Sequence, residues 1–273
     1  MKKRGAAPDR PLALVTGASS GIGAAFARAL AARGYDVALT ARRADRLEAL
    51  AEDVRRTYGV DAMVIVQDLA ELGAHEVILK AIAERGREVD MLVNNAGFSI
   101  AESFAAVPWG RQQAFLMTLV VNACALAHGV IPAMVRRGQG RIVNVASMAA
   151  FAPGVAGHSL YPGAKSLMVT FSQALDAEYQ RHGLKVTAIC PGFTVTEFSK
   201  ANGTAAVMSK SPRRLFQTAE HVVEVALRAN DRGRVVVIPG WYNVLAAILL
   251  RHLPAGLVRS ILMRASAKYH LEG

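Results

Sequence analysis

A tyrosine, a lysine and a serine in this chain have the types and spacing needed for proton transfer. Tyr161 and Lys165 are four residues apart in the segment YPGAK, so a helix there would place both on one face. A free phenol has a pKa of about 10, and a nearby ammonium favours its ionised form and lowers that pKa. Ser147, after a predicted strand, can donate a hydrogen bond to a substrate oxygen that gains charge. Each residue alone is common in turns and on helix surfaces, so the prediction depends on the elements around them.

A glycine-rich turn precedes these residues in the chain. The segment TGASSGIG covers 16–23, between an apolar run at 12–15 and a helical stretch at 24–33. Glycines let backbone N–H groups approach an anion, and the N-terminus of the following helix adds its positive dipole end. The spacing is G-x-x-x-G-x-G rather than G-x-G-x-x-G. We therefore predict a dinucleotide phosphate site formed by Gly17, Ser19, Ser20, Gly21, Ile22 and Gly23.

The end of the second apolar run indicates which dinucleotide is bound. Many dinucleotide-binding folds place an acidic residue there to bond the ribose 2′-hydroxyl. This chain has Ala41 at that point, followed by Arg42 and Arg43. Without a carboxylate, and with two cations nearby, a 2′-phosphate would be attracted, which predicts NADP(H) rather than NAD(H). The alternative, that both arginines only decorate a helix N-terminus, is disfavoured because cations there oppose the helix dipole.

Short apolar runs alternate with helical patterns along most of the chain. The runs lie at 12–15, 36–40, 62–66, 91–93, 141–145, 185–189 and 234–238. The helical stretches lie at 24–33, 44–58, 74–85, 111–137, 164–181 and 219–229, and each is closely followed by a glycine. Near-continuous apolar strands alternating with helices are typical of a parallel sheet covered on both faces. The pattern predicts a single-domain, Rossmann-like, doubly wound α/β fold of about seven strands.

Two segments fall outside this alternation, and with the N-terminus they define the predicted organisation. Residues 1–10 form a basic arm, and 11–240 form the Rossmann-fold domain. Within that domain, 193–216 is an irregular connection predicted to act as a substrate lid. Residues 241–273 form an apolar, basic extension.

Composition excludes several classes of protein. The chain has 273 residues, 52% of them hydrophobic and 19% charged, which is unlike a disordered protein. Its two cysteines, Cys124 and Cys190, lie in apolar runs and predict small buried side chains rather than a disulfide scaffold. The net charge is +11, but no nucleic-acid-binding motif accompanies it, so no nucleic-acid partner is expected. We also expect no segment long and apolar enough to cross a membrane, and a cytoplasmic location.

At this point the sequence resembles the short-chain dehydrogenase/reductase family over about residues 10–240. The matching motifs are TGASSGIG at 16–23, the NNAG segment at 94–97, Ser147, YPGAK at 161–165, and Pro191 with Gly192, in the family's order. The resemblance implies an oxidoreductase that moves a hydride between NADP(H) and a carbonyl or secondary alcohol. The alternative on the same fold is a catalytically silent, NADPH-binding regulatory protein, which the intact Ser147, Tyr161 and Lys165 disfavour.

The resemblance also implies roles for further residues. Ser147, Tyr161 and Lys165 would be catalytic, Lys165 would also bond the nicotinamide ribose, and Asn122 would hold a water in a proton relay. The expected coenzyme contacts beyond the glycine turn and the arginines are Asp68, Leu69, Asn95, Ala96, Gly97, Tyr161, Lys165, Pro191, Gly192, Thr194 and Thr196. Asn95 could equally stabilise the sheet. Homo-dimers or homo-tetramers are implied as well, with the helices around 111–137 and 164–181 as pairing surfaces.

The residues expected at the substrate are mostly apolar. They are Ser147, Met148, Phe151, Tyr161, Phe193 and Phe198, with Phe98, Ser99, Met208 and Phe216 nearby. This set predicts a hydrophobic ketone or aldehyde, such as a fatty-acyl, steroid-like or aromatic carbonyl compound. His158, close to Tyr161, could border the substrate, but a solvated loop histidine is favoured. No histidine, cysteine or acidic cluster has metal-ligand spacing, so no metal is expected.

The extension at 241–273 has apolar residues at helical spacing together with arginines and a lysine. A basic amphipathic helix can pack on a second subunit or over the substrate cleft, which we favour here. It can also lie on an anionic membrane surface, which would make the protein peripheral to a membrane.

Overall fold

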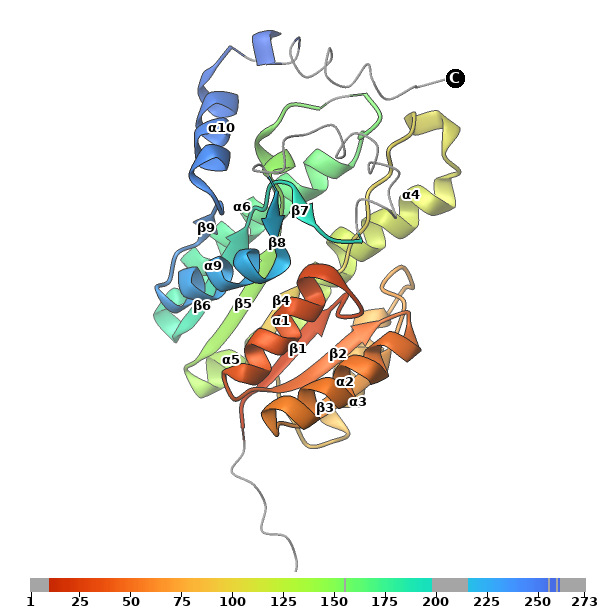
Figure 1. The fold of residues 1–273 in the computed structure, drawn as a ribbon, viewed down its shortest axis with the longest axis vertical. Helices are drawn as coiled ribbons and strands as arrows, with labels where there is room; N and C mark the ends of the chain where they lie inside the picture. The colour runs from red at the N-terminus through yellow and green to blue at the C-terminus, as the bar shows by residue number, and fades with distance from the viewer. Residues whose placement is uncertain (1–9, 155, 198–215, 255, 259, 261–273) are drawn as a thin grey trace, which may run out of the picture.

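A seven-stranded parallel sheet forms the centre of the molecule (Figure 1). The computed structural model describes residues 10–154, 156–197, 216–254, 256–258 and 260. The strand order is β3-β2-β1-β4-β5-β6-β9. The strands are β1 (Leu12–Thr16), β2 (Asp36–Ala41), β3 (Ala62–Val66), β4 (Met91–Asn94), β5 (Gly140–Val145), β6 (Leu184–Ile189) and β9 (Val236–Val237). The order reverses between β1 and β4, and ligands of such sheets bind beyond the carboxyl ends of the strands at that point.

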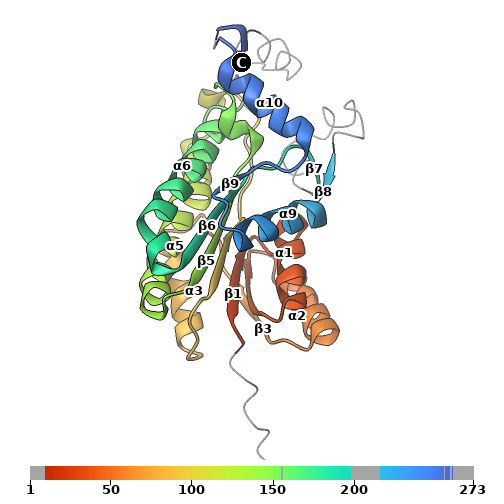
Figure 2. The ribbon, with the colours of Figure 1, turned by 90° about the vertical axis from the view of Figure 1, so that its left-hand side faces the viewer.

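Helices cover both faces of this sheet (Figure 2). One face carries α1 (Gly21–Ala32), α2 (Ala44–Tyr58) and α9 (Ala219–Asp231). The other carries α3 (Ala74–Ala83), α5 (Asn122–Arg137) and α6 (Tyr161–Tyr179). The doubly wound α/β fold predicted from the apolar runs is therefore confirmed.

The position of β1 between two layers of helices explains why its sequence is apolar throughout. Ala13 and Val15 belong to the core on the α1 side, whereas Leu12 and Leu14 belong to the core on the α3 side. All four side chains are buried. A strand enclosed on both faces needs apolar residues at every position rather than at alternate ones.

The helix predicted at 111–137 is interrupted. It consists of α4 (Trp109–Leu116), a π-helical segment η2 (Met117–Val121) and α5. Such π segments are often found at functional sites. Here the segment ends directly before Asn122, which is fully buried and bonded across to the loop after β3.

The connection predicted to be irregular at 193–216 begins and ends in a short strand pair. β7 (Thr194–Val195) pairs in parallel with β8 (Gln217–Thr218). Residues 198–215, between them, lie outside the described part of the chain. The final strand of the main sheet, β9, is shorter than the predicted run at 234–238, and Pro239 and Gly240 follow it.

The expectation that no segment is long and apolar enough to cross a membrane is wrong. Within the described residues, the continuous helix Trp109–Arg137 meets that length and composition. Half of its most apolar window is buried inside the protein, because α5 packs against the sheet and α3. Such burial is typical of a helix in the core of a protein.

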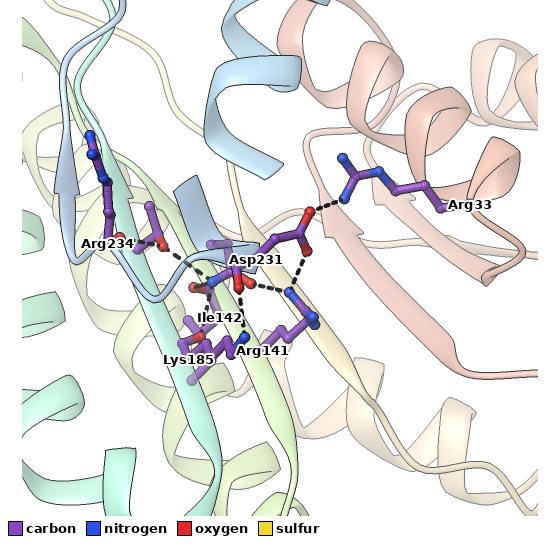
Figure 3. A network of polar contacts seen from close by, with 8 residues as sticks. Arg33, Arg141, Ile142, Lys185, Asp231 and Arg234 are labelled. Carbon is purple, nitrogen blue, oxygen red and sulfur yellow. Dashed lines mark hydrogen bonds and ion pairs between the residues drawn. The ribbon is translucent and has the colours of Figure 1, made fainter. Parts of the chain in front are cut away.

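A polar network fixes the end of α9 at the edge of the sheet opposite the glycine turn (Figure 3). The buried amide of Asn230 donates to the Lys185 carbonyl at 3.0 Å and accepts from Arg141 at 2.9 Å. Asp231 joins the Arg141 guanidinium at 2.8 Å to that of Arg33 at 3.0 Å. This network links α1, β5, β6 and α9 and holds the sheet on which the site is built.

Candidate active site

The turn between β1 and α1 is a tight cradle at the carboxyl edge of the sheet. Gly17 has a φ of 64°, and a Cβ there would stand 2.8 Å from the Cα of Ala96. A Cβ on Gly23 would stand 2.3 Å from the carbonyl oxygen of Gly17. Because α1 begins at Gly21, its first N–H groups lack helical partners and lie at this turn. The geometry fits the close approach of a dinucleotide pyrophosphate to the backbone.

The loop after β4 locks this turn in place. The Asn95 side chain donates to the carbonyl oxygens of Thr16 at 2.9 Å and Gly17 at 3.3 Å. In return, the Thr16 hydroxyl accepts from the backbone N–H groups of Asn95 and Ala96. The structure therefore shows Asn95 stabilising the turn, and its contact with the coenzyme stays a prediction.

Three side chains converge beyond β5. Ser147 caps the short helix η3 (Met148–Phe151), and its hydroxyl accepts from the Ala149 N–H at 3.1 Å. It also shares a hydrogen bond with Tyr161, the first residue of α6. One turn later, the Lys165 Nζ donates to the Val145 carbonyl at 2.7 Å and lies 5.7 Å from the centre of the Tyr161 ring. The structure thus brings together the serine, tyrosine and lysine that were predicted to be catalytic.

Burial changes the protonation of this group. It raises the pKa of Tyr161 above its ordinary value, and the hydrogen bond with Ser147 opposes the rise. Burial also lowers the pKa of Lys165 to about 8. The predicted lowering of the phenol pKa is therefore wrong, since desolvation of Tyr161 is the largest effect on it and exceeds that of the hydrogen bond with Ser147. Burial thus disfavours the charged form of both groups, the phenolate of Tyr161 and the ammonium of Lys165.

A small cavity with room for about one water molecule lies beside Lys165. Its lining comprises Thr16, Leu69, Asn94, Ala96, Thr118, Leu119, Ala123, Val145, Lys165 and Met168. The cavity therefore joins the lysine to the glycine turn and to the π-helical segment. Polar groups at both sides make it suited to a bound water.

The hydrogen bonds of the Asn122 side chain in the structure differ from the proton-relay role implied for it. Its amide nitrogen donates to the carbonyls of Leu69 at 2.9 Å and Glu71 at 3.0 Å, and its oxygen accepts from the His75 N–H at 3.3 Å. The side chain thereby fastens the loop after β3 to α5. The relay role of Asn122 stays a prediction.

The edge predicted to hold the adenosine half carries several charged contacts. Arg42 lies 3.6 Å from Asp68, and its side chain is 72% exposed. Arg43 turns the other way and donates to the hydroxyls of Ser19 at 2.9 Å and Ser20 at 2.7 Å. Arg43 therefore lies against the glycine turn, whereas Arg42 borders the loop after β3.

The segment after β6 completes the cradle. It contains four residues predicted to touch the coenzyme, namely Pro191, Gly192, Thr194 and Thr196. Pro191 accepts a hydrogen bond from the Met148 N–H at 2.9 Å, which ties this segment to η3. Thr196 faces Gly21, where an added Cβ would lie 3.1 Å from its side chain. The two ends of the segment thus lie beside the serine region and the glycine turn.

Aromatic residues form the apolar side of the site. The ring of Phe115 lies 6.4 Å from that of Tyr161 and 5.6 Å from that of Phe98. Phe193 stacks on Phe216 at 5.7 Å. A second small cavity beside Tyr161 is lined by Ile100, Glu102, Gln112, Phe115, Ser159, Leu160 and Tyr161. Met148 and Phe151 lie on η3 as described, whereas Phe198 and Met208 fall outside the described residues.

His158 differs from the expectation of a solvated loop histidine. It is half-buried, its Nδ1 lies 3.2 Å from the Ser99 hydroxyl, and burial lowers its pKa. Each residue directly precedes one that lines the second cavity, namely Ile100 and Ser159. Within the part of the chain that the structure describes, no group of three or more histidine, cysteine or acidic side chains could hold a metal ion.

Sequence reasoning missed a ladder of buried polar residues under the site. Asn94 donates to the Asn144 side chain at 3.0 Å, and Asn144 donates to the Ser172 hydroxyl at 2.8 Å. These bonds join β4, β5 and α6, which carry the loop after β4, Ser147 and Tyr161. Two asparagines inside otherwise apolar strands were the available signal, because buried polar side chains require partners.

The sequence of this chain is similar to those of known oxidoreductases. The family model described as short chain dehydrogenase matches residues 11–206. An uncharacterized oxidoreductase of Myxococcus xanthus is 32% identical over 89% of this chain and 92% of its own length. A very-long-chain 3-oxoacyl-CoA reductase of Anas platyrhynchos is 35% identical over 69% of this chain and 61% of its own length.

Solved structures of dehydrogenases are also similar to this chain. A short-chain dehydrogenase from Sphingobium yanoikuyae in complex with NADPH has a TM-score of 0.76 and 32% identity, covering 89% of this chain and 96% of that one. A bulky-bulky ketone specific alcohol dehydrogenase from Comamonas testosteroni has a TM-score of 0.74 and 27% identity, covering 96% and 95%.

The fold and the cradle define a Rossmann-like, nucleotide-binding α/β protein of the oxidoreductase class. Within that class, the chain belongs to the short-chain dehydrogenase family, and the predicted resemblance is confirmed.

Proposed function

We propose that this protein is an NADP(H)-dependent oxidoreductase acting on a carbonyl or secondary alcohol. The observation that carries the proposal is the convergence of Ser147, Tyr161 and Lys165 beside a cradle in which Gly17 and Gly23 leave no room for a side chain. When bound, the nicotinamide supplies or accepts the hydride. Tyr161 gives the proton to the substrate oxygen or takes it back, while Ser147 donates a hydrogen bond to that oxygen. Lys165 holds the ribose and stabilises the ionised phenol.

The preference for NADP(H) is supported by the charges around the cradle. β2 ends at Ala41, where no carboxylate would repel a 2′-phosphate. Arg43 lies against Ser19 and Ser20 of the glycine turn. The similar Sphingobium enzyme was solved in complex with NADPH. We propose that Asp68, Leu69, Ala96 and Gly97 meet other parts of the coenzyme, as the family resemblance implies.

The substrate we propose is a hydrophobic ketone or aldehyde. Phe98 and Phe115 belong to one apolar cluster with Tyr161. Phe193, in the segment after β6, stacks on Phe216. Among similar proteins, one is named for very-long-chain 3-oxoacyl-CoA and another for bulky ketones. The test is a panel of ketones and aldehydes assayed by loss of NADPH absorbance. Turnover of bulky apolar carbonyls supports the proposal. Turnover restricted to small charged compounds contradicts the substrate class, and NADPH binding without any turnover favours the silent regulatory alternative.

The buried lysine leads to a prediction about pH. Because the pKa of Lys165 is about 8, its ammonium is present below that pH and is lost above it. The affinity for NADPH should therefore fall as pH rises through about 8, and Lys165→Met should bind more weakly with no such dependence. The Cys190 thiol beside Lys165 does not ionise in this pH range, because burial raises its pKa to about 12. Fluorescence titration of NADPH from pH 6.5 to 9.5 measures the affinity of both proteins. If Lys165→Met showed the same pH dependence of affinity as the parent, Lys165 would be excluded as the titrating group.

The long core helices offer a surface for self-association. Val121 is 44% exposed and Leu167 is 39% exposed, and they lie at the helices predicted to pair between subunits. We propose that the protein forms a homo-dimer or homo-tetramer through this region. We also propose a cytoplasmic location, which the free thiols of Cys124 and Cys190 support.

The helix α10 (Trp241–His252) presents an apolar face above the carboxyl edge of the sheet (Figure 1). Its inner face is buried at Asn243, which lies against Gly192 and so supports the predicted packing over the cleft. Its outer face is exposed at Trp241, Val244, Leu245, Ile248 and Leu249. The helix ends in Arg251 and His252.

We propose that this outer face of α10 docks on an anionic membrane surface. A net charge of +11 attracts anionic lipid. The double variant Trp241→Ser/Ile248→Ser should lose co-sedimentation with phosphatidylglycerol-containing vesicles. Leu72→Ser, at a side chain 90% exposed in a remote loop, should not. A double variant that sediments normally, or that changes the oligomeric mass instead, would contradict membrane docking.

A further inference from the structure

The carboxylate of Glu197 occupies a site made by two arginines at the start of α2. One of its oxygens accepts from the Arg43 Nη1 at 3.1 Å and from the Arg46 Nη1 at 2.6 Å. Arg43 also donates to Ser19 and Ser20 in the glycine turn. Two guanidinium groups therefore hold one anionic group at the rim of the cradle, and two hydroxyls of the turn hold one of those guanidinium groups. Arg46 was not among the predicted cofactor ligands.

Electrostatics explains why this place needs an anion. Arg43 is the N-cap residue of α2 and Arg46 lies in its first turn, where the helix dipole is positive and disfavours cations. Glu197 comes from the segment after β6, directly after Thr196, which faces the glycine turn. The hydrogen bonds from Arg46 and Arg43 hold the pKa of Glu197 below its usual range, so this carboxyl is ionised at neutral pH. It supplies the negative charge that the two arginines require.

The ion pairs of Glu197 with Arg43 and Arg46 form in the structure, but they are weak enough for another anion to displace the carboxylate. The side chains of Arg43, Arg46 and Glu197 are 42%, 42% and 50% exposed, and ion pairs so open to solvent contribute little to stability. A phosphate monoester carries a charge of about −1.5 to −2 at pH 7 and presents three acceptor oxygens, against the single charge of a carboxylate. Arginine forks bind such groups through two parallel hydrogen bonds.

We propose that Glu197 is a built-in competitor for the 2′-phosphate of NADP(H), and that Arg46 acts with Arg43 as the arginine pair for which both compete. Glu197 then sets how strongly the enzyme prefers NADPH over NADH, because NADH has no group that displaces it. The inference rests on the proposed function only in taking NADP(H) as the cofactor. It assigns a specificity-determining role to a residue outside the family's sequence motifs.

The test compares four single variants in their binding of NADPH and NADH. Glu197→Gln removes the competing charge, and Glu52→Gln removes an exposed carboxylate elsewhere on α2 as the matched control. Arg46→Met removes one arginine of the pair, and Arg56→Met removes an exposed arginine near the other end of the same helix. Adenosine 2′,5′-bisphosphate and adenosine 5′-monophosphate serve as probes that contain or lack the 2′-phosphate without the nicotinamide.

The expected results differ between the ligands. Glu197→Gln should tighten binding of NADPH and the bisphosphate by up to about fivefold. Arg46→Met should weaken both by about tenfold, the size of a charge-assisted hydrogen bond. Binding of NADH and the monophosphate should stay unchanged in both variants, and the two control variants should match the parent protein with every ligand.

Several results would overturn the inference. Unchanged or weaker NADPH binding by Glu197→Gln would show that Glu197 does not compete with the phosphate. Equal tightening of NADPH and NADH, or an equal effect of Glu52→Gln, would show a general effect of charge. If the parent protein bound neither nicotinamide cofactor, the proposed function itself would fail. A parent protein that prefers NADPH with no response at Glu197 or Arg46 would refute the inference alone.

Discussion

Replacement of Tyr161 by phenylalanine is expected to abolish turnover while NADPH still binds. The variant keeps the ring that lies near Phe115 and Lys165 but removes the hydroxyl that shares a hydrogen bond with Ser147. Proton transfer by a positioned side chain contributes about 10²–10⁴-fold to a rate, so kcat should fall at least a hundredfold. The measurement is steady-state turnover of the best carbonyl substrate together with fluorescence titration of NADPH.

Two comparisons make this result specific to the hydroxyl of Tyr161. Tyr179→Phe, at the other end of α6, should leave kcat unchanged. Thermal unfolding should show that Tyr161→Phe remains folded. If the folded Tyr161→Phe variant retained a substantial share of the parent kcat, another group would have to supply the proton.

The second large effect is expected at Gly23. Its Cβ in Gly23→Ala would stand 2.3 Å from the Gly17 carbonyl oxygen and 2.5 Å from the Asn95 amide nitrogen. The turn must open to accept it, at a cost of about 1–3 kcal/mol in the free energy of unfolding. Because the Asn95 amide that this Cβ would displace fixes the cradle by donating to the Thr16 and Gly17 carbonyls, NADPH affinity should fall by more than tenfold.

Gly110→Ala provides the control for this prediction. Gly110 lies in α4, and a Cβ there would meet nothing within 4 Å. Alanine is the better helix former by about 0.5–1 kcal/mol, so this variant should be as stable as the parent or slightly more so. Thermal melts and NADPH titrations of both variants measure the difference. Normal NADPH affinity in Gly23→Ala would mean that the turn does not contact the cofactor.

Much of the architecture could be predicted because it depends on local sequence. Strands buried on both faces must be apolar throughout, which located β1 to β6 to within a residue or two at each end. Glycines after helices, such as Gly59 and Gly138, have the positive φ values that close a helix. The four-residue spacing of Tyr161 and Lys165 likewise holds on α6.

The features that were not predicted depend on tertiary structure. Glu197 and Arg46 are 151 residues apart, and no periodicity links them. The π-helical segment interrupts a stretch whose apolar pattern is continuous. The direction of the Tyr161 pKa shift follows from how deeply α6 buries the phenol, which spacing along a helix does not reveal.

A crystal structure of the protein with bound NADP⁺ tests the central claim most directly. The account predicts the pyrophosphate against the turn at 17–23, the 2′-phosphate at Arg43, and the Tyr161 hydroxyl facing the open side of the nicotinamide near C4, where a substrate carbonyl must lie. A cofactor bound elsewhere, or a Tyr161 hydroxyl directed away from the nicotinamide, would contradict it.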